Sequence, residues 1–210
     1  MAVDVRGAFI TFEGSEGSGK STQVKLLCRY LRAKRKKVLM IREPGGVVIS
    51  EKIRQILLDV KNTGMNEICE TLLYMAARAQ LVHDVIVPAL KKGVVVLCDR
   101  FLDSTMAYQG YGNGVNRDFI KTVGRFATQN ISPDLTLIFD ISIKEGLARR
   151  GKIRDRIERR ALTYHNRVRN GYLDLARKEP ARIKVIDGSV SKEVIQKIVK
   201  NHVNHLLKIL

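Results

Sequence analysis

The pattern of hydrophobic and polar positions divides the chain into alternating strand-like and helix-like segments. Short and nearly continuous apolar runs, bounded by charged or turn-forming residues, are typical of buried parallel strands. Such runs predict strands at residues 8–13, 38–43, 94–99, 135–141 and 182–187. A strand at each of these places leaves room for a helical crossover between successive strands.

Between these runs, apolar residues recur at spacings of three and four, which is the period of a helix face. The pattern predicts helices at residues 20–35, 50–59, 66–92, 116–130 and 191–208. Ser50 is the expected cap of the second helix, and the third helix is expected to be interrupted near Pro88. A further helix face runs from Ile157 through His165 to Leu175. Alternation of this kind predicts an α/β fold around a parallel sheet.

Length and composition favour one soluble domain. The 210 residues fit a single domain, residues 1–210. No apolar run approaches the ~20 residues of a membrane span, and the beginning of the chain lacks the pattern of a signal peptide. Cys28, Cys69 and Cys98 lie far apart, which favours reduced thiols and a cytoplasmic location.

The net charge of +17 allows two interpretations. One is binding to nucleic acid or to a membrane surface, and the other is a site for small polyanions. The cationic residues are scattered, and no aromatic residues interleave the densest run at 29–37 in the way a nucleic-acid platform requires. The pattern therefore favours small phosphorylated molecules, with no nucleic-acid or membrane partner. His83, His165, His202 and His205 show no metal-ligand spacing.

A glycine-rich segment carries the first chemical signal. It matches the pattern GxxxxGK[ST], follows a predicted strand and opens a predicted helix. Its backbone N–H groups and the helix N-terminus would bind phosphate oxygens, Lys20 would reach the β- and γ-phosphates, and Ser21 would ligate Mg²⁺. The segment predicts a nucleoside triphosphate site made of Gly14, Ser15, Glu16, Gly17, Ser18, Gly19, Lys20, Ser21 and Thr22.

The P-loop pattern does not say which molecule receives the phosphoryl group of the triphosphate. A switch GTPase would carry an Asn-Lys-x-Asp motif late in the chain, and the sequence has none. Arginines instead occur in several other segments, as a second phosphorylated substrate would need. Asp99 and Arg100 end a buried strand, where ligands of α/β sheets bind. Asp99 can orient Mg²⁺ through water and Arg100 can bridge two phosphates, or the two side chains can form a structural ion pair.

Four blocks together resemble bacterial thymidylate kinase, within the P-loop nucleoside monophosphate kinases. They are FITFEGSEGSGKST, REPGG, CDRFLDSTMAYQGYG and DRIE, in family order across essentially the whole chain. The resemblance implies a three-layer fold with a five-stranded parallel sheet and a small mobile lid. It implies transfer of a phosphoryl group from ATP to dTMP, giving ADP and dTDP, with Mg²⁺. It also implies a homodimer packed through helices beside the sheet.

The resemblance assigns the phosphate and sugar side of the acceptor pocket. Glu16 stands where the family has an acid that touches the 3′-hydroxyl of the acceptor. Glu43 and Pro44 match a cis peptide that shapes the pocket, and Arg54 matches an arginine that grips the acceptor phosphate. Tyr108 is expected to crowd the 2′ position and so favour deoxyribose.

The resemblance also assigns the base side. Tyr74 and Arg78, four residues apart on one predicted helix, match an aromatic ring that stacks on thymine and an arginine at the edge of the base. Thr105 and Gln109 match positions that hydrogen-bond the pyrimidine edge. For each of these residues the alternative is ordinary packing or a solvated charge.

The lid segment, about residues 149–158, would bring arginines over the transferring phosphate and exclude water. Arg150 and Arg154 are the candidate catalytic arginines there. Some family members carry a P-loop arginine where this chain has Gly17, so the charge would come from the lid. Val47 replaces the usual threonine after REPGG, which raises the question of what orders that loop.

Two other functions remain open from the residues alone. The chain could phosphorylate another nucleoside monophosphate or a deoxynucleoside. Several arginines facing the acceptor argue against a deoxynucleoside, because it carries no charge. It could also be a P-loop protein that binds nucleic acid, which only the net charge suggests.

Overall fold

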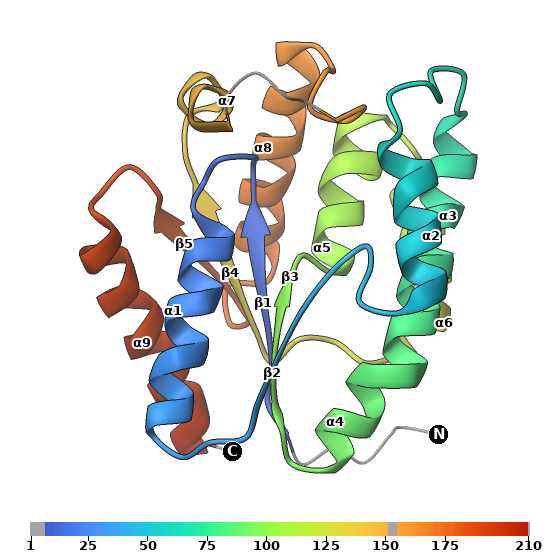
Figure 1. The fold of residues 1–210 in the computed structure, drawn as a ribbon. Coiled ribbons are helices and arrows are strands. Elements are labelled where there is room, and N and C mark those ends of the chain that lie inside the picture. Colours follow the sequence, from blue (N-terminus) through green and yellow to red (C-terminus); the bar gives the residue numbers. More distant parts are fainter. Residues whose placement is uncertain (1–6, 151–154, 210) are drawn as a thin grey trace.

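A parallel sheet forms the centre of the molecule (Figure 1). The structure, a computed structural model, describes residues 7–150 and 155–209. The strands are β1 (Phe9–Gly14), β2 (Val38–Arg42), β3 (Val95–Asp99), β4 (Leu135–Asp140) and β5 (Ile183–Asp187). They pair in the order β2-β3-β1-β4-β5, and every pairing is parallel. The predicted α/β fold is confirmed, with strand ends that differ from the prediction by at most one residue.

The strand order explains where a ligand can bind. β1 lies between β3 and β4, with Phe12 beside Asp99 and Gly14 beside Phe139. The connections that leave the carboxyl ends of β1 and its neighbours therefore diverge to opposite sides of the sheet. Such a divergence opens a crevice at the carboxyl edge of an α/β sheet.

Helices cover both faces of the sheet (Figure 1). On one face lie α1 (Lys20–Ala33) and α9 (Lys192–Ile209). The other elements are α2 (Val48–Leu58), α3 (Glu67–Leu81), the π-helix η1 (Val82–Ile86), α4 (Val87–Lys91), α5 (Leu102–Thr105), the π-helix η2 (Met106–Gly112), α6 (Arg117–Ala127), α7 (Ile143–Arg150) and α8 (Leu162–Lys178). Most of these cover the second face, whereas α7 lies above the carboxyl edge.

Burial of apolar side chains on both faces stabilises these layers. Phe12, Leu27 and Val199 join the sheet to α1 and α9 in one fully buried cluster. On the other face, Phe9 packs edge-to-face against Phe101, with ring centroids 4.8 Å apart. Each such side chain contributes roughly 1.5–3 kcal/mol relative to an exposed position.

The long helical segment predicted at 66–92 is interrupted close to Pro88, as expected, by a π-helical stretch. The Asn66 side chain caps α3 by accepting from the backbone N–H of Ile68, and the helix then widens into η1. Pro88 lies in the first turn of α4, directly after this π-helical stretch. The interruption therefore precedes the proline.

Two local predictions are wrong. Ser50 does not cap α2, because that helix begins at Val48 and the buried Ser50 hydroxyl donates to Ala77 O at 2.7 Å. A buried hydroxyl needs a partner, and the neighbouring helix α3 supplies one. Ile157 does not belong to α8, which begins at Leu162; it is buried in the preceding turn, which explains its place in the apolar pattern.

Candidate active site

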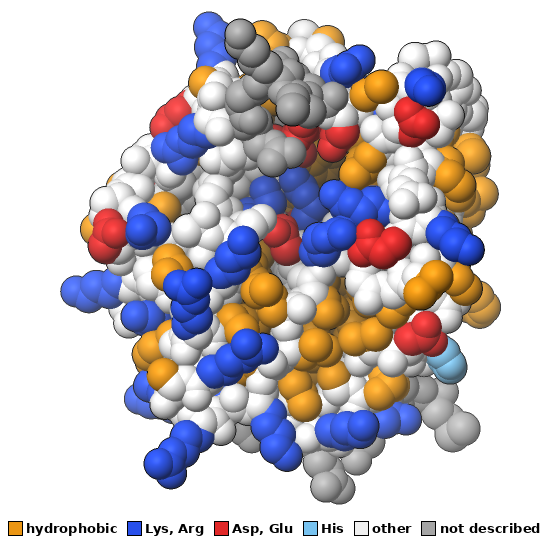
Figure 2. All heavy atoms as spheres, in the orientation of Figure 1, with side chains coloured by type: hydrophobic (Ala, Val, Ile, Leu, Met, Phe, Trp, Pro, Cys, Tyr) orange, Lys and Arg blue, Asp and Glu red, His pale blue; other side chains and the backbone are white. Residues whose placement is uncertain are grey.

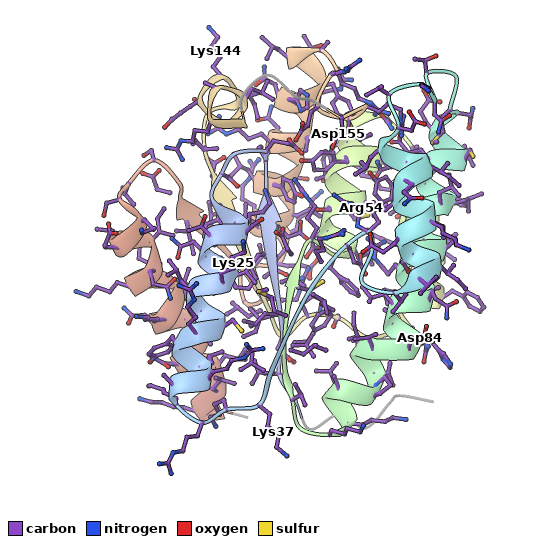
Figure 3. All side chains as sticks on the ribbon, in the orientation of Figure 1. Lys25, Lys37, Arg54, Asp84, Lys144 and Asp155 are labelled. Atoms are coloured by element: carbon purple, nitrogen blue, oxygen red, sulfur yellow. The ribbon has the colours of Figure 1, made fainter. Side chains whose placement is uncertain are left out.

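A cavity of about 320 Å³ lies at the carboxyl edge of the sheet. Figure 2 shows the hollow, with Lys and Arg side chains gathered in it beside a few carboxylates. In Figure 3, Arg54 and Asp155 lie on its sides, whereas Lys25, Lys37 and Asp84 lie away from it. The predicted site residues that line it are Glu16, Gly17, Ser18, Gly19, Lys20, Ser21, Thr22, Glu43, Pro44, Arg54, Tyr74, Arg78, Asp99, Arg100, Thr105, Tyr108 and Gln109.

The remaining predicted site residues do not line the cavity. Gly14 and Ser15 are the first two residues of the P-loop (Gly14–Ser21), and their carbonyl oxygens accept hydrogen bonds from Lys20. The side chain of Arg150 and all of Arg154 lie outside the described residues. Arg149, at the start of the predicted lid segment, pairs through its Nη2 with Glu145 Oε1 at 2.6 Å.

Lys20 is held inside the P-loop. Its Nζ donates to Ser15 O at 2.6 Å, to Gly14 O at 2.9 Å and to Ser18 Oγ at 3.3 Å. Burial, together with the nearby charge of Arg100, lowers the pKa of Lys20 to about 8. A phosphate group in the loop would favour the charged ammonium and so oppose this shift.

Close packing explains one glycine of the loop. Gly17 has φ of +70°, and a Cβ there would lie 2.0 Å from the carbonyl oxygen of Gly146 in α7. Only glycine allows this backbone conformation and this approach at no steric cost. The P-loop therefore packs directly against the helix that leads into the predicted lid segment.

Ser21 and Asp99 form an oxygen-rich pair beside the P-loop. The Ser21 hydroxyl donates to Asp99 Oδ2 at 2.5 Å. A hydroxyl and a carboxylate suit Mg²⁺, which takes oxygen ligands, keeps several waters and uses substrate phosphates in kinase sites. Among the described residues no cluster of three or more His, Cys, Asp or Glu side chains could hold a metal alone. The residues present therefore fit an ion shared with a nucleotide.

Arg100 lies at the centre of the polar network. Its Nη2 donates to Glu16 Oε1 at 3.0 Å, and its Nη1 donates to Tyr172 OH at 3.1 Å and to Ser104 Oγ at 3.2 Å. Its guanidinium also lies 4.9 Å from the centroid of the Tyr108 ring. These contacts fix an always-charged group at the carboxyl end of β3, where it faces the cavity.

Glu16 receives several favourable contacts despite its burial. The Tyr108 hydroxyl donates to Glu16 Oε1 at 2.5 Å, and His165 Nδ1 lies 3.8 Å from Oε2. Burial opposes ionisation of Glu16, but the charges of Arg100 and Lys20 outweigh it and hold its pKa below the usual value. Glu16 is therefore an anionic acceptor for a hydroxyl group in the cavity.

Sequence reasoning missed Glu13, which supports this network from below. Glu13 is fully buried at the end of β1 and accepts from Phe101 N at 2.7 Å, from Tyr172 OH at 2.9 Å and from the Ser104 hydroxyl. Burial, together with the nearby Asp103, raises its pKa to about 7. A glutamate inside an otherwise apolar strand was the available signal.

The loop after β2 carries the predicted cis peptide between Glu43 and Pro44, which is confirmed. The loop is ordered without a threonine at position 47. Glu51 accepts from Gly46 N at 2.7 Å and from Arg42 Nη2 at 2.9 and 3.0 Å. Arg54 Nη1 donates to Pro44 O at 3.0 Å, which ties α2 to the loop beside the cavity.

The far end of the cavity is built from α3 and η2. Arg78 is 2% exposed, and its Nε donates to Glu43 Oε2 at 2.8 Å. Tyr74 lies on the same face of α3, and Thr105 and Gln109 contribute from the helix opposite. A second residue that the sequence did not reveal, Glu70, accepts from Gln109 Nε2 at 2.9 Å.

The segment before α8 closes one side of the cavity. Asp155 Oδ1 accepts from the backbone N–H groups of Ile157 and Glu158, both at 2.9 Å. These bonds form a tight turn that presents Asp155, Ile157 and Glu158 to the cavity.

The fold and this site define a class. A P-loop at the carboxyl edge of a parallel sheet faces a pocket that Arg42, Arg54, Arg78 and Arg100 supply with positive charge. This combination is that of a P-loop kinase with two anionic substrates.

Comparison with known proteins identifies the family. The family model described as thymidylate kinase matches residues 12–199. The thymidylate kinase of Pelobacter propionicus is 47% identical over 95% of this chain and 97% of its own length. That of Symbiobacterium thermophilum is 48% identical over 95% and 94%. The crystal structure of thymidylate kinase from Ehrlichia chaffeensis superimposes with a TM-score of 0.78 at 33% identity, over 94% of this chain and 98% of its own. The chain belongs to the thymidylate kinase family.

Proposed function

We propose that this protein transfers the γ-phosphoryl group of ATP to dTMP, giving ADP and dTDP. The observation that carries this proposal is one continuous cavity, which joins the P-loop to an arginine-supplied pocket ending at Tyr74 and Gln109. Family membership over residues 12–199 supports the choice of dTMP as the acceptor.

The donor triphosphate binds in the P-loop. Backbone N–H groups of residues 14–22 and the N-terminus of α1 receive its oxygens. Lys20 exchanges its contacts with Gly14 and Ser15 for the β- and γ-phosphates. The exchange costs little, because the ammonium group trades backbone carbonyls for charged oxygens.

Ser21 and Asp99 hold Mg²⁺ with the triphosphate, Ser21 directly and Asp99 through water. Their contact at 2.5 Å places both oxygens on the same side of the P-loop. The ion would neutralise negative charge on the phosphate groups during transfer.

The acceptor occupies the other end of the cavity. Arg54 and Arg100 bind its phosphate, and Glu16 accepts a hydrogen bond from its 3′-hydroxyl. Tyr108 packs against the 2′ carbon, where a ribose hydroxyl would meet the ring. Tyr74 stacks on the thymine. The base edge then faces Arg78, Thr105 and Gln109.

Transfer needs alignment and positive charge more than acid–base chemistry. The attacking phosphate oxygen is already ionised at neutral pH, so no general base is required. Arg100 is anchored between the two phosphate sites and stabilises the transferring group. We assign the same role to the lid arginines Arg150 and Arg154, which would also help to exclude water.

A coupled assay of ADP release tests the proposal. Wild-type protein with ATP and Mg²⁺ is given dTMP, dUMP, dCMP, dAMP or UMP in turn. We expect strong turnover with dTMP, little with UMP, and a loss of about 10²-fold or more in kcat for Lys20→Ala. Lys25→Ala, on an exposed part of the same helix, should match the wild type. Equal turnover with all acceptors, or ATP consumption without one, would reject the acceptor assignment.

We also propose a cytoplasmic homodimer. Cys69 is free and exposed, which suits a reducing compartment. In the part of the chain that the structure describes, no helix is both long and apolar enough to cross a bilayer. The dimer proposal rests on exposed apolar side chains of α3 and α6.

A further inference from the structure

Glu70 is a fully buried carboxylate beside the base end of the cavity. It lies on α3 with 0% exposure and accepts four hydrogen bonds. Its Oε2 accepts from Arg156 at 2.5 Å and from Arg160 at 2.6 Å. Its Oε1 accepts from Gln109 Nε2 at 2.9 Å and from Asn113 Nδ2 at 3.1 Å. Two cations thus compensate the charge, while two amides share the remaining oxygen.

This network settles which way the Gln109 amide points. An ionised carboxylate accepts hydrogen bonds and donates none, so a side-chain amide can approach it only with its NH₂ group. Asn113 is oriented in the same way, because its Oδ1 accepts from Arg160 Nη1 while its Nδ2 faces Glu70. The amide orientation of Gln109 therefore follows from the donors and acceptors around it.

This orientation leaves the Oε1 atom of the Gln109 amide on the side opposite to Glu70. Gln109 lines the cavity, and among the described residues no donor reaches its Oε1. A base in the cavity therefore meets an acceptor at this position. Thymine offers a donor, its N3–H, whereas N3 of cytosine is an acceptor and would leave Oε1 facing a lone pair.

We propose that Glu70 is a specificity-determining positioning residue: by fixing Gln109 with Oε1 toward the base, it selects thymine over cytosine. The inference rests on the proposed function, because it takes the acceptor to be a pyrimidine nucleotide bound at this end of the cavity. Glu70 itself touches no substrate and acts through Gln109.

The first test replaces the carboxylate with an amide. Glu70→Gln keeps the shape but can donate as well as accept, so the Gln109 amide is free to turn. We expect the ratio of kcat/KM for dCMP to that for dTMP to rise by roughly tenfold or more. Glu67→Gln, at an exposed position on the same helix, should leave the ratio unchanged. An equal loss of activity toward both substrates, with no change in the ratio, would overturn the proposal, because a merely structural role predicts that result.

A double-mutant cycle tests whether Glu70 acts through Gln109. In a Gln109→Leu background, Glu70→Gln should no longer change the dCMP to dTMP ratio. A further change in that background would overturn the assigned route. Glu70→Asp keeps an acceptor-only group and should retain the preference for dTMP even if activity falls.

A substrate analogue tests the proposal on the wild-type protein, so the result does not depend on whether a variant folds. A thymidylate analogue with C–H in place of N3–H should lose roughly tenfold or more in kcat/KM, because Oε1 of Gln109 is then unpaired. Unchanged turnover of this analogue would overturn the proposal while leaving dTMP kinase activity intact. Absence of turnover with dTMP itself would instead refute the proposed function.

Discussion

Arg100 adopts a left-handed backbone conformation, with φ of 73°, that costs a non-glycine residue roughly 1–2 kcal/mol. The cost is offset because the conformation lets Arg100 N donate to Phe12 O at 3.0 Å and lets Phe101 N donate to Glu13 at 2.7 Å. The same turn directs the guanidinium at Glu16 and Tyr172. The sequence predicts a functional arginine at this strand end, but not the buried carboxylate that supports it.

The Glu13→Gln variant tests whether burial raises the pKa of this carboxylate. Burial raises the pKa of Glu13 in the folded protein to about 7, from an ordinary value of 4.5. The folded state therefore binds the proton more tightly than the unfolded chain. The contribution of this group to stability is fully present below about pH 4.5 and is lost as the pH rises through about 7.

The glutamine does not titrate. As the pH rises from about 4.5 to about 7, we therefore expect the free energy of unfolding of Glu13→Gln to increase by a few kcal/mol relative to that of the wild type. Urea unfolding of both proteins at several pH values measures this difference, in which the titration of other groups largely cancels. A difference that is independent of pH would contradict the assignment.

At the scale of elements, α3 and α6 show an apolar face that the fold itself leaves uncovered. Phe119 and Phe126 lie seven residues apart on α6, with exposures of 36% and 89%. Ile68 and Leu72 on the adjoining α3 are each 45% exposed. These helices pack against one another, so the four side chains belong to adjacent surfaces. Exposed apolar side chains on adjoining helices favour association, and the isologous face of a homodimer can bury them.

The substitution Phe126→Asp should disrupt the proposed dimer. A carboxylate in the middle of an apolar interface would be desolvated without a partner, which is strongly unfavourable. We expect sedimentation or light scattering to report a dimer for the wild type and a monomer for the variant. Val194→Asp, at a position 48% exposed on α9, is the matched control and should stay dimeric. A wild type that is monomeric at micromolar concentration would refute the dimer.

At the scale of the whole molecule, the charge of +17 is distributed rather than gathered into a track. In Figure 2 the cationic side chains are spread over the visible face, with a concentration in the cavity. Several cations of the cavity already face carboxylates, such as Arg78 with Glu43 and Arg100 with Glu16. This arrangement suits the binding of a small phosphorylated molecule better than the binding of a long nucleic acid.

We therefore expect no saturable binding of duplex DNA or single-stranded RNA at physiological ionic strength. Fluorescence anisotropy of labelled oligonucleotides, titrated with protein at several salt concentrations, measures it. Tight binding that weakens steeply with salt would mean that the charge serves nucleic acid after all.

By itself, the sequence determined the layers and the phosphate site. Apolar runs and helical periods are local properties, and the P-loop from Gly14 to Ser21 is a continuous segment whose glycines and lysine act within one turn. Strand ends also predicted where Asp99 and Arg100 would lie. Family resemblance added the residues of the acceptor pocket, which come from separate segments.

Only the tertiary structure decided how separate segments orient one another. Ser50 bonds to α3 instead of capping its helix, and Ile157 fills the core from a turn. Glu70 meets Gln109 across 39 residues, and Glu13 meets Tyr172 across 159. Such contacts have no local pattern, because a buried polar group is satisfied by whichever donor the packing brings near it.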